Sequence, residues 1–177
     1  MDHKAGYVNI IGKPNVGKST LMNALVGEKI SIITSKAQTT RHRILGIVNG
    51  EDFQIVFSDT PGIIKKPAYK MHEIMNQYIK VAFIDADLIL YVVDITDKKI
   101  DEETTERIKA MDVPVFVLLN KIDLSNQEEV EKAVAYWSEA IPQATVFPIS
   151  AKHEANIQYV LENIIQKLPE CPPYFPK

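Results

Sequence analysis

The pattern Gly12-x-x-x-x-Gly17-Lys18-Ser19 combines residue types that bind phosphate. Its glycines allow successive backbone N–H groups to point into one concavity, where they donate to phosphate oxygens. Lys18 would neutralise the outer phosphates as a point charge, and the Ser19 hydroxyl is a Mg²⁺ ligand. The pattern favours a polyphosphate site over the simpler alternative, a glycine-rich turn with a surface lysine. The residues expected in this site are Gly12, Asn15, Val16, Gly17, Lys18, Ser19 and Thr20.

The stretch VFSDTPG places a carboxylate at the end of an apolar run. Asp59 is positioned to hold Mg²⁺ through water. Gly62 has no Cβ, so its backbone N–H can approach a terminal phosphate. The same residue types also favour an ordinary turn, and only the phosphate-binding pattern nearby favours the metal interpretation.

The stretch LLNKID indicates which base the nucleotide carries, because Asp123 is an ionised acceptor without a donor. Guanine offers it two donors, the ring N1–H and the exocyclic amine. Adenine has an unprotonated ring nitrogen there and would leave the carboxylate unpaired. We expect Asp123 to select guanine and Asn120 to bond the imidazole side of the base. We expect Lys121 to pack on the ring and tie this segment to the phosphate loop.

A fourth stretch, Ile149-Ser150-Ala151-Lys152, follows the last apolar run. We expect the Ala151 N–H to donate to the guanine carbonyl, with Ser150 and Lys152 beside the base. Three such residues are too few to carry a prediction alone. The carboxyl ends of strands in an open sheet meet at one edge, so the four stretches are expected to form one site.

These stretches need a sheet to bring them together, and six apolar runs supply the strands. Several are apolar at consecutive positions, which is typical of parallel strands buried on both faces. Asn49-Gly50-Glu51-Asp52 separates the second run from the third and predicts an antiparallel hairpin. The expected strands are 7–12, 42–50, 52–59, 87–94, 113–120 and 144–150.

Segments of helical character fill the gaps between the runs. Ser125, followed by Glu128, predicts a capping box at the start of the fourth helix. The alternation predicts an α/β fold of three layers: a six-stranded, mostly parallel sheet with one antiparallel strand, and helices on both faces. The expected helices are 18–26, about 69–84, 101–111, 127–140 and 156–167.

Composition narrows the classes of protein further. The 177 residues suffice for one domain, and a formal net charge of −3 excludes a broad basic surface for nucleic acid. The single cysteine, Cys171, excludes an internal disulfide. No apolar run approaches the roughly 20 residues of a membrane span, so we expect a cytosolic protein. The proline-rich tail, residues 169–177, is expected to be a linker leaving the domain.

Taken together, the motifs resemble the translation-factor-related P-loop GTPases, the TrmE–Era–EngA-like group. Gln38-Thr39-Thr40-Arg41 is similar to the bacterial Era family, whereas related families tend to carry Gly-Thr-Thr-Arg-Asp or Gly-Val-Thr-Arg-Asp. The resemblance covers essentially all 177 residues. It implies a Ras-like fold, with residues 1–168 as an Era-type GTPase domain and 169–177 as a linker toward an absent C-terminal KH domain.

The resemblance also implies an activity and partners. The chain is expected to bind GTP or GDP with Mg²⁺, to hydrolyse GTP slowly and to switch between two states. Through the missing KH domain the family binds 16S rRNA and helps to assemble the small ribosomal subunit. Loose contact with the inner face of the cell membrane and a monomeric state are further expectations.

Roles for individual residues follow from the same resemblance. Lys18, Thr40 and Gly62 are the expected catalytic residues, and Ser19, Thr40 and Asp59 the expected metal ligands, with Thr39 as the less favoured alternative to Thr40. Many relatives carry glutamine after the D-x-x-G glycine. Ile63 stands there in this chain and cannot orient water, so we expect slow unassisted turnover. Asn15 is either a K⁺ ligand or a residue that shapes the loop.

Three other interpretations remain open. The first is a GTP-gated binding module with negligible catalysis. The second is a sibling GTPase domain that acts on tRNA modification or large-subunit assembly. The third is an ATPase with a similar phosphate loop. Hydrolysis assays, the length of the whole gene and competition by ATP distinguish these possibilities.

Overall fold

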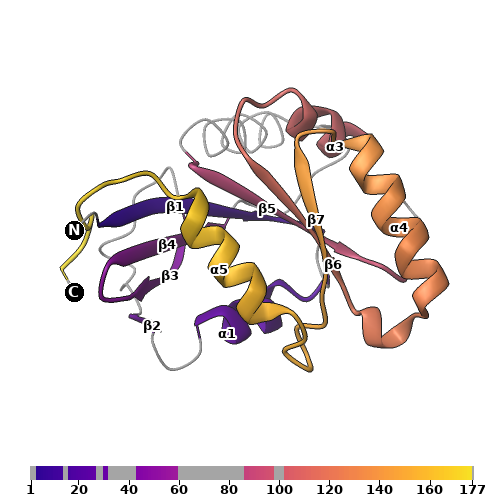
Figure 1. The fold of residues 1–177 in the computed structure, drawn as a ribbon, viewed down its shortest axis with the longest axis horizontal. Helices are drawn as coiled ribbons and strands as arrows, with labels where there is room; N and C mark the ends of the chain where they lie inside the picture. The colour runs from indigo at the N-terminus through magenta and orange to yellow at the C-terminus, as the bar shows by residue number, and fades with distance from the viewer. Residues whose placement is uncertain are drawn as a thin grey trace, which may run out of the picture.

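The computed structural model describes residues 3–13, 16–26, 30–31, 43–59, 86–97 and 102–176. Its strands and helices alternate along the chain, as the sequence predicts (Figure 1). The strands are β1 (Lys4–Ile11), β2 (Ile30–Ser31), β3 (Arg43–Asn49), β4 (Phe53–Asp59), β5 (Leu88–Asp94), β6 (Val115–Asn120) and β7 (Ala144–Pro148). The helices are α1 (Lys18–Val26), α3 (Glu102–Lys109), α4 (Gln127–Ala140), α5 (Ile157–Lys167) and the short 3₁₀ helix η3 (Ile122–Leu124).

All strands join one sheet in the order β2-β3-β4-β1-β5-β6-β7. β4, β1, β5, β6 and β7 run parallel, and β3 is antiparallel to β4 through the predicted hairpin. The six predicted strands are therefore present. A two-residue strand, β2, extends the edge beyond β3 and was not predicted. The expected helix at about 69–84 lies outside the described residues.

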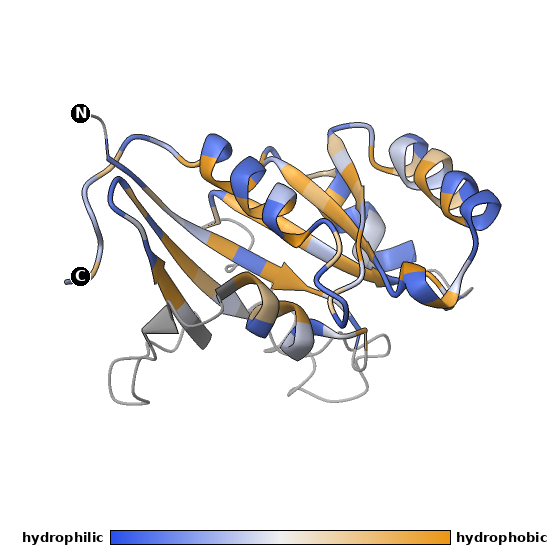
Figure 2. Cartoon of the chain, turned by 60° about the horizontal axis from the view of Figure 1, so that its bottom comes forward, coloured by the Kyte–Doolittle hydropathy of each residue, from blue (hydrophilic) through white to orange (hydrophobic). Residues whose placement is uncertain are grey.

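Helices cover both faces of the sheet, and most of the length of its central strands is coloured as hydrophobic (Figure 2). In β5, Leu88, Leu90 and Val92 pack in the core that includes α1 and α5. Ile89 and Tyr91, which alternate with them, pack in the core that includes α3 and α4. Burial on both faces explains why this strand is apolar at consecutive positions.

The start of α4 differs from the prediction. The residue that caps the helix is Asn126, whose Oδ1 accepts a hydrogen bond from the Glu129 backbone N–H at 2.9 Å. The predicted cap, Ser125, was wrong: its backbone N–H closes the turn of η3 on Ile122 O instead. Two adjacent capping patterns are present in the sequence, and the η3 turn decides between them by using Ser125.

The tail after α5, predicted as a linker leaving the domain, instead packs back against the domain at residues 171–175. The Cys171 N–H donates to His3 O at 2.8 Å, and the Tyr174 ring lies 4.9 Å from the Tyr7 ring, centroid to centroid. Gln54, fully buried on β4, bonds the backbone of Tyr174 and Phe175. The chain therefore returns to the beginning of β1 before it ends, and both termini lie at the same side of the molecule (Figure 1).

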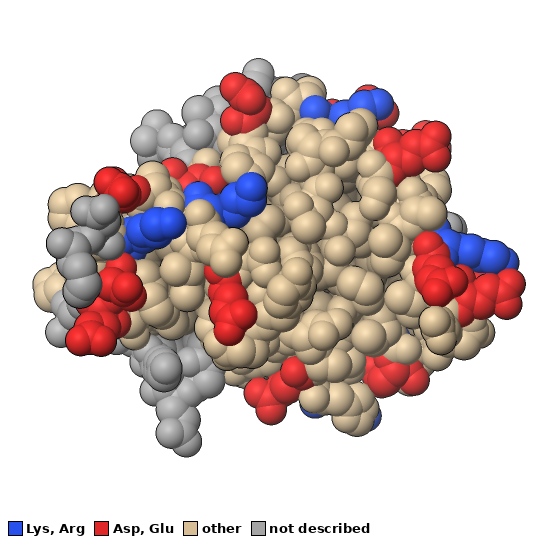
Figure 3. All heavy atoms as spheres, in the orientation of Figure 1, with Lys and Arg blue, Asp and Glu red and all other residues tan. Residues whose placement is uncertain are grey.

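None of the helices in the described part is long and apolar enough to cross a membrane. On the face shown in Figure 3, basic and acidic side chains of the described residues are interspersed rather than separated into patches of one sign.

Candidate functional site

Topology brings the four predicted stretches to one edge of the sheet. The phosphate-loop pattern follows β1, Asp59 ends β4, Asn120 ends β6 and Ser150 follows β7. Since these strands are parallel, their carboxyl ends point the same way, and Ile10 on β1 pairs directly with Asp59 on β4. The site therefore lies where open α/β sheets bind ligands.

Gly17 has a backbone conformation that favours glycine, with φ of 96°. A Cβ added there would collide with Asn120 Nδ2. Gly12 is also confined, since its Cβ would lie 2.8 Å from Val92 O and 2.9 Å from Val16 Cγ2. The Leu21 N–H bonds Gly17 O at 2.9 Å, so α1 begins directly at the loop and presents its N-terminus to the site. This geometry fits a phosphate cradle.

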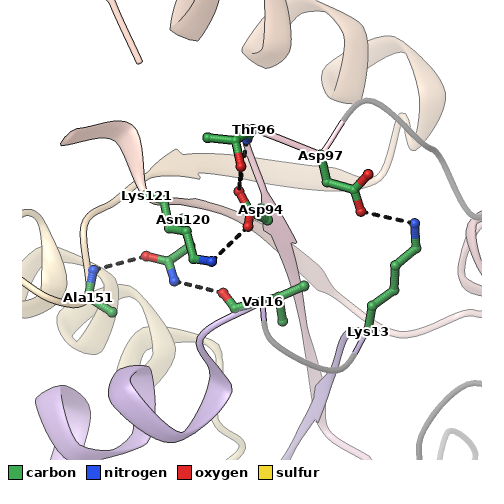
Figure 4. A network of polar contacts seen from close by, with 8 residues as sticks. All are labelled: Lys13, Val16, Asp94, Thr96, Asp97, Asn120, Lys121 and Ala151. Carbon is green, nitrogen blue, oxygen red and sulfur yellow. Dashed lines mark hydrogen bonds and ion pairs between the residues drawn. The ribbon is translucent and has the colours of Figure 1, made fainter. Parts of the chain in front are cut away.

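Asn120 joins the phosphate loop to the base-binding segments (Figure 4). Its Nδ2 donates to Val16 O at 2.9 Å, and its Oδ1 accepts from the Ala151 N–H at 2.9 Å. The side chain is 2% exposed. The motifs predict that Lys121 makes this tie and that both Asn120 and the Ala151 N–H bond the base. In the structure Asn120 makes the tie, and the Ala151 N–H bonds the Asn120 amide.

Lys121 has a left-handed backbone, with φ of 71°, and precedes η3. Its Nζ lies 2.8 Å from Asp94 Oδ2 (Figure 4). Asp94 is not among the residues predicted for the site, although a carboxylate at the carboxyl end of β5 repeats the signal that identifies Asp59 on β4. The pairing itself was not predictable, because 27 residues separate the two side chains.

Asp123 is oriented by residues that follow β7. The Ser150 hydroxyl donates to its Oδ1 at 2.8 Å, and His153 Nε2 lies 3.6 Å from its Oδ2. The Ser150 hydrogen bond outweighs partial desolvation and lowers the pKa of the Asp123 carboxyl below its ordinary value, with smaller contributions from His153 and Lys152. The Asp123 side chain is 24% exposed and therefore accessible to a ligand, and the lowered pKa keeps its carboxyl ionised at neutral pH. His153 was not among the predicted site residues.

A pocket of about 240 Å³ opens between these segments. It is smaller than the roughly 300 Å³ at which sites for drug-sized ligands begin, so it suits one part of a nucleotide, such as the base. Leu124 and Lys152 form its exposed rim. The residues that line it are Gly17, Thr20, Asn120, Lys121, Asp123, Leu124 and Lys152.

Mg²⁺ fits the residues of this edge. Ser19 is exposed in the first turn of α1, directly after the cradle, and β4 delivers Asp59 from the adjacent strand. The described residues contain no group of three or more His, Cys, Asp or Glu side chains that would hold a metal by themselves. Mg²⁺ is usually bound by one or two protein oxygens and completes its coordination with phosphate oxygens and water, and the Ser19 hydroxyl is an oxygen of this kind. Asn15, Thr40 and Gly62, and the Asp59 side chain, lie outside the part that the structure describes.

The phosphate cradle between β1 and α1, the Asn-Lys-x-Asp segment after β6 and the Ser-Ala-Lys segment after β7 define the site of a P-loop GTPase. A family model described as "50S ribosome-binding GTPase" matches residues 7–121. Since the match covers well over half of the chain, the protein belongs to this family.

Curated relatives narrow the resemblance to Era. The chloroplastic GTPase ERA1 of Zea mays is 44% identical over 180 residues, which are 99% of this chain and 43% of the relative. GTPase Era of Alkaliphilus metalliredigens is 44% identical over 179 residues, covering 99% of this chain and 60% of the relative. The Era resemblance is thus confirmed, and this chain spans about half the length of the relatives it matches.

Solved structures also show that this chain is similar to Era. Era in complex with MgGDPNP and nucleotides 1506–1542 of 16S ribosomal RNA superimposes with a TM-score of 0.80 at 41% identity, covering 98% of this chain and 60% of that one. An Aquifex aeolicus Era variant bound to GDP·AlF4⁻ has a TM-score of 0.79 at 41% identity, with the same coverage. The predicted fold class is confirmed.

Proposed function

We propose that the chain binds guanine nucleotides with Mg²⁺ and hydrolyses GTP as the switch of an Era-type protein. The observation that carries this proposal is the position of Asp123, an ionised and accessible carboxylate in a pocket shared with Gly17. Guanine supplies two donors to such an acceptor, and adenine supplies none at the ring nitrogen. Membership in a GTPase family and the Era relatives support the assignment.

Hydrolysis at this site requires charge neutralisation and an aligned water. Lys18 would neutralise the outer phosphates, and Ser19 with Asp59 would hold Mg²⁺, which neutralises charge between them. We assign Thr40 to the metal and the Gly62 N–H to the terminal phosphate. Ile63 cannot orient water, so we propose a slow intrinsic rate that rises when another group positions the water.

Nucleotide titration by calorimetry tests the base assignment. We expect GDP and GTP to bind and ADP and ATP to give no heat. Asp123→Asn replaces one acceptor by a donor, so it should weaken GDP binding by about 100-fold and favour xanthosine diphosphate, which has a carbonyl where guanine has an amine. Ser138→Asn, on the exposed side of α4, is the control. Equal affinity for GDP and ADP in the unmodified protein contradicts the proposal.

We further propose that the whole protein acts in assembly of the small ribosomal subunit, contacting 16S rRNA through a C-terminal KH domain outside these 177 residues. An Era structure bound to 16S rRNA supports this, as does the fraction of the relatives' length that this chain covers. We place the protein in the cytoplasm, with peripheral contact to the membrane and a monomeric state as further proposals. Binding of the full-length protein to purified 30S subunits with a GTP analogue, but not with GDP, is the expected result.

The family description favours a second candidate, because it names 50S rather than 30S binding. The two are distinguished by offering the full-length protein both subunits in one sedimentation experiment. Recovery with 50S alone would replace small-subunit assembly by large-subunit assembly and would leave guanine binding intact. Identity of 42–44% to Era over nearly the whole chain favours the first outcome.

We also propose that K⁺ contributes to hydrolysis through Asn15, because K⁺-stimulated GTPases of the group that this chain resembles carry Asn at this position of the phosphate loop. A monovalent cation beside the phosphates would supply positive charge to the site. GTP turnover should be faster in K⁺ than in Na⁺ at equal ionic strength. Equal GTP turnover in K⁺ and Na⁺ would assign Asn15 to the shape of the loop. In a separate single-turnover experiment, a hydrolysis rate equal to that in buffer alone would support the non-catalytic binding module.

A further inference from the structure

Two ion pairs connect the nucleotide site to the segment that ends β5 (Figure 4). Lys121 Nζ lies 2.8 Å from Asp94 Oδ2, and Lys13 Nζ lies 3.2 Å from Asp97 Oδ2. Lys121 belongs to the base-binding segment, and Lys13 belongs to the phosphate-loop pattern. The segment Asp94–Asp97 therefore contacts both halves of the site, and no predicted role accounts for it.

Asp94 is itself held firmly. Its Oδ1 accepts hydrogen bonds from the Thr96 N–H at 2.8 Å and from the Thr96 hydroxyl at 2.6 Å, which leaves Oδ2 facing Lys121. The Asp94 side chain is 13% exposed. Burial alone would raise the pKa of Asp94, but the hydrogen bonds from Lys121 and Thr96 lower it below the ordinary value. The Asp94 carboxylate that contacts Lys121 is therefore both fixed in position and ionised.

Lys121 and Asp94 have different relations to the base pocket. Lys121 lines it, together with Asp123 and Lys152. Asp94 is absent from the lining and reaches the pocket only through the lysine. An aliphatic stem anchored at its charged end covers apolar surface in a fixed position, whereas an unanchored lysine loses rotamer entropy when a ligand orders it.

We propose that Asp94 is a positioning residue for nucleotide binding: it anchors the Lys121 ammonium at the edge of the base pocket, so that the lysine stem forms a preset wall for the purine ring. The inference rests on the proposed binding of guanine nucleotides. Asp94 does not line the base pocket, so its effect on the rate of nucleotide release is exerted through Lys121.

Release of a fluorescent GDP analogue from the Mg²⁺-loaded protein tests the role. Asp94→Asn keeps the shape and the Thr96 contacts but removes the charge that holds Lys121. We expect release about fivefold to tenfold faster, as for a partly buried, charge-assisted hydrogen bond. Glu103→Gln is the matched control, since it removes a 2.9 Å ion pair with Arg107 on α3, away from the site. Its release rate should equal that of the unmodified protein.

A double-mutant cycle separates positioning from a general structural effect. Lys121→Met keeps the aliphatic stem and loses the ammonium that Asp94 holds. If Asp94 acts through Lys121, adding Asp94→Asn to Lys121→Met should change release by less than about twofold. If the two effects multiply fully, Asp94 supports the fold and the proposal is overturned.

Thr96→Val provides a milder variant if Asp94→Asn does not fold. It removes the 2.6 Å hydroxyl contact to Asp94 and preserves every charge, and we expect release about twofold faster. Release unchanged in every variant that folds would overturn the inference. Failure of the unmodified protein to bind the GDP analogue would instead contradict the proposed function, so the two failures are distinguishable.

Discussion

At the scale of single residues, the site depends on side chains that hold one another before a ligand arrives. The side-chain amide of Asn120 donates through Nδ2 to the phosphate loop and accepts through Oδ1 from the segment after β7. Ser150 orients Asp123 in the same way. A preset acceptor binds its ligand without a large loss of side-chain entropy, which favours tight binding of the correct base.

The Ser150 hydroxyl also sets how the site responds to acid. Its hydrogen bond to Asp123 is the largest effect that lowers the pKa of that carboxyl. We therefore expect guanine recognition to persist as the pH falls, until the lowered pKa is reached. Ser150→Ala moves the pKa back up toward 3.8, and the loss of GDP affinity on acidification should begin at a higher pH. At pH 7 we expect about threefold to tenfold weaker binding.

GDP titrations of both proteins from pH 7 down to about pH 3, in the range where circular dichroism shows them folded, measure this shift. Ser138→Ala on α4 controls for loss of a hydroxyl. Superimposable pH profiles for Ser150→Ala and the unmodified protein would show that Ser150 does not control the ionisation of Asp123.

At the scale of elements, the strands and helices deliver these residues by simple rules. Parallel strands buried on both faces bring their carboxyl ends to one edge, and each functional stretch begins where such a strand ends. The phosphate loop needs glycine at position 17, where φ is positive and Asn120 leaves no room for a Cβ. The local conformation and the contact with a distant segment thus require the same residue.

The cap of α4 gives a test at this scale. Asn126→Ala removes the side-chain oxygen that accepts from the Glu129 N–H and should lower the free energy of unfolding by about 1 kcal/mol. Ser125→Ala is the matched control, since the Ser125 contact in the turn comes from its backbone, and it should change stability by less than about 0.5 kcal/mol. Urea denaturation measures both variants, and the reverse order would restore Ser125 as the cap.

At the scale of the whole molecule, the C-terminal tail forms part of the folded domain. Gln54 is fully buried, and its Oε1 accepts from the Tyr174 and Phe175 N–H groups at 2.8 and 3.1 Å. Its Nε2 donates to Phe175 O at 2.9 Å. Phe175 also packs beside Ile47 and Val56. A segment with four prolines keeps few backbone donors, and a buried glutamine satisfies those of residues 174 and 175.

Gln54→Leu should release the tail. The substitution keeps the volume but removes every hydrogen bond of the amide, so we expect a loss of about 2–4 kcal/mol in the free energy of unfolding. Amide exchange at Tyr174 and Phe175 should become faster. GDP affinity should stay unchanged, because Gln54 lies near the start of β4 and the nucleotide site lies at its end.

Gln127→Leu, on exposed α4, controls for the same chemical change, and we expect little effect on stability. Slow exchange at Tyr174 and Phe175 in Gln54→Leu would show that the tail is held by its aromatic contacts rather than by the glutamine.

The sequence by itself determined the α/β class, the six main strands, the described α-helices to within a few residues and the four stretches that meet at the site, but not the short 3₁₀ helix η3. These features depend on local properties: runs of apolar residues, the conformational freedom of glycine and the donors and acceptors that each side chain carries. Such properties can be read without knowing which segments touch.

The tertiary structure alone decided which of these groups pair. Asn120 and Val16 are 104 residues apart, Lys121 and Asp94 are 27 apart, and Gln54 and Phe175 are 121 apart. Each of these side chains has several chemically acceptable partners in the sequence, and the choice depends on distances that the packed sheet sets. For that reason the sequence names the residues predicted to meet the ligand, whereas the contacts of Asp94, His153 and Gln54 with other parts of the protein appear only in the fold.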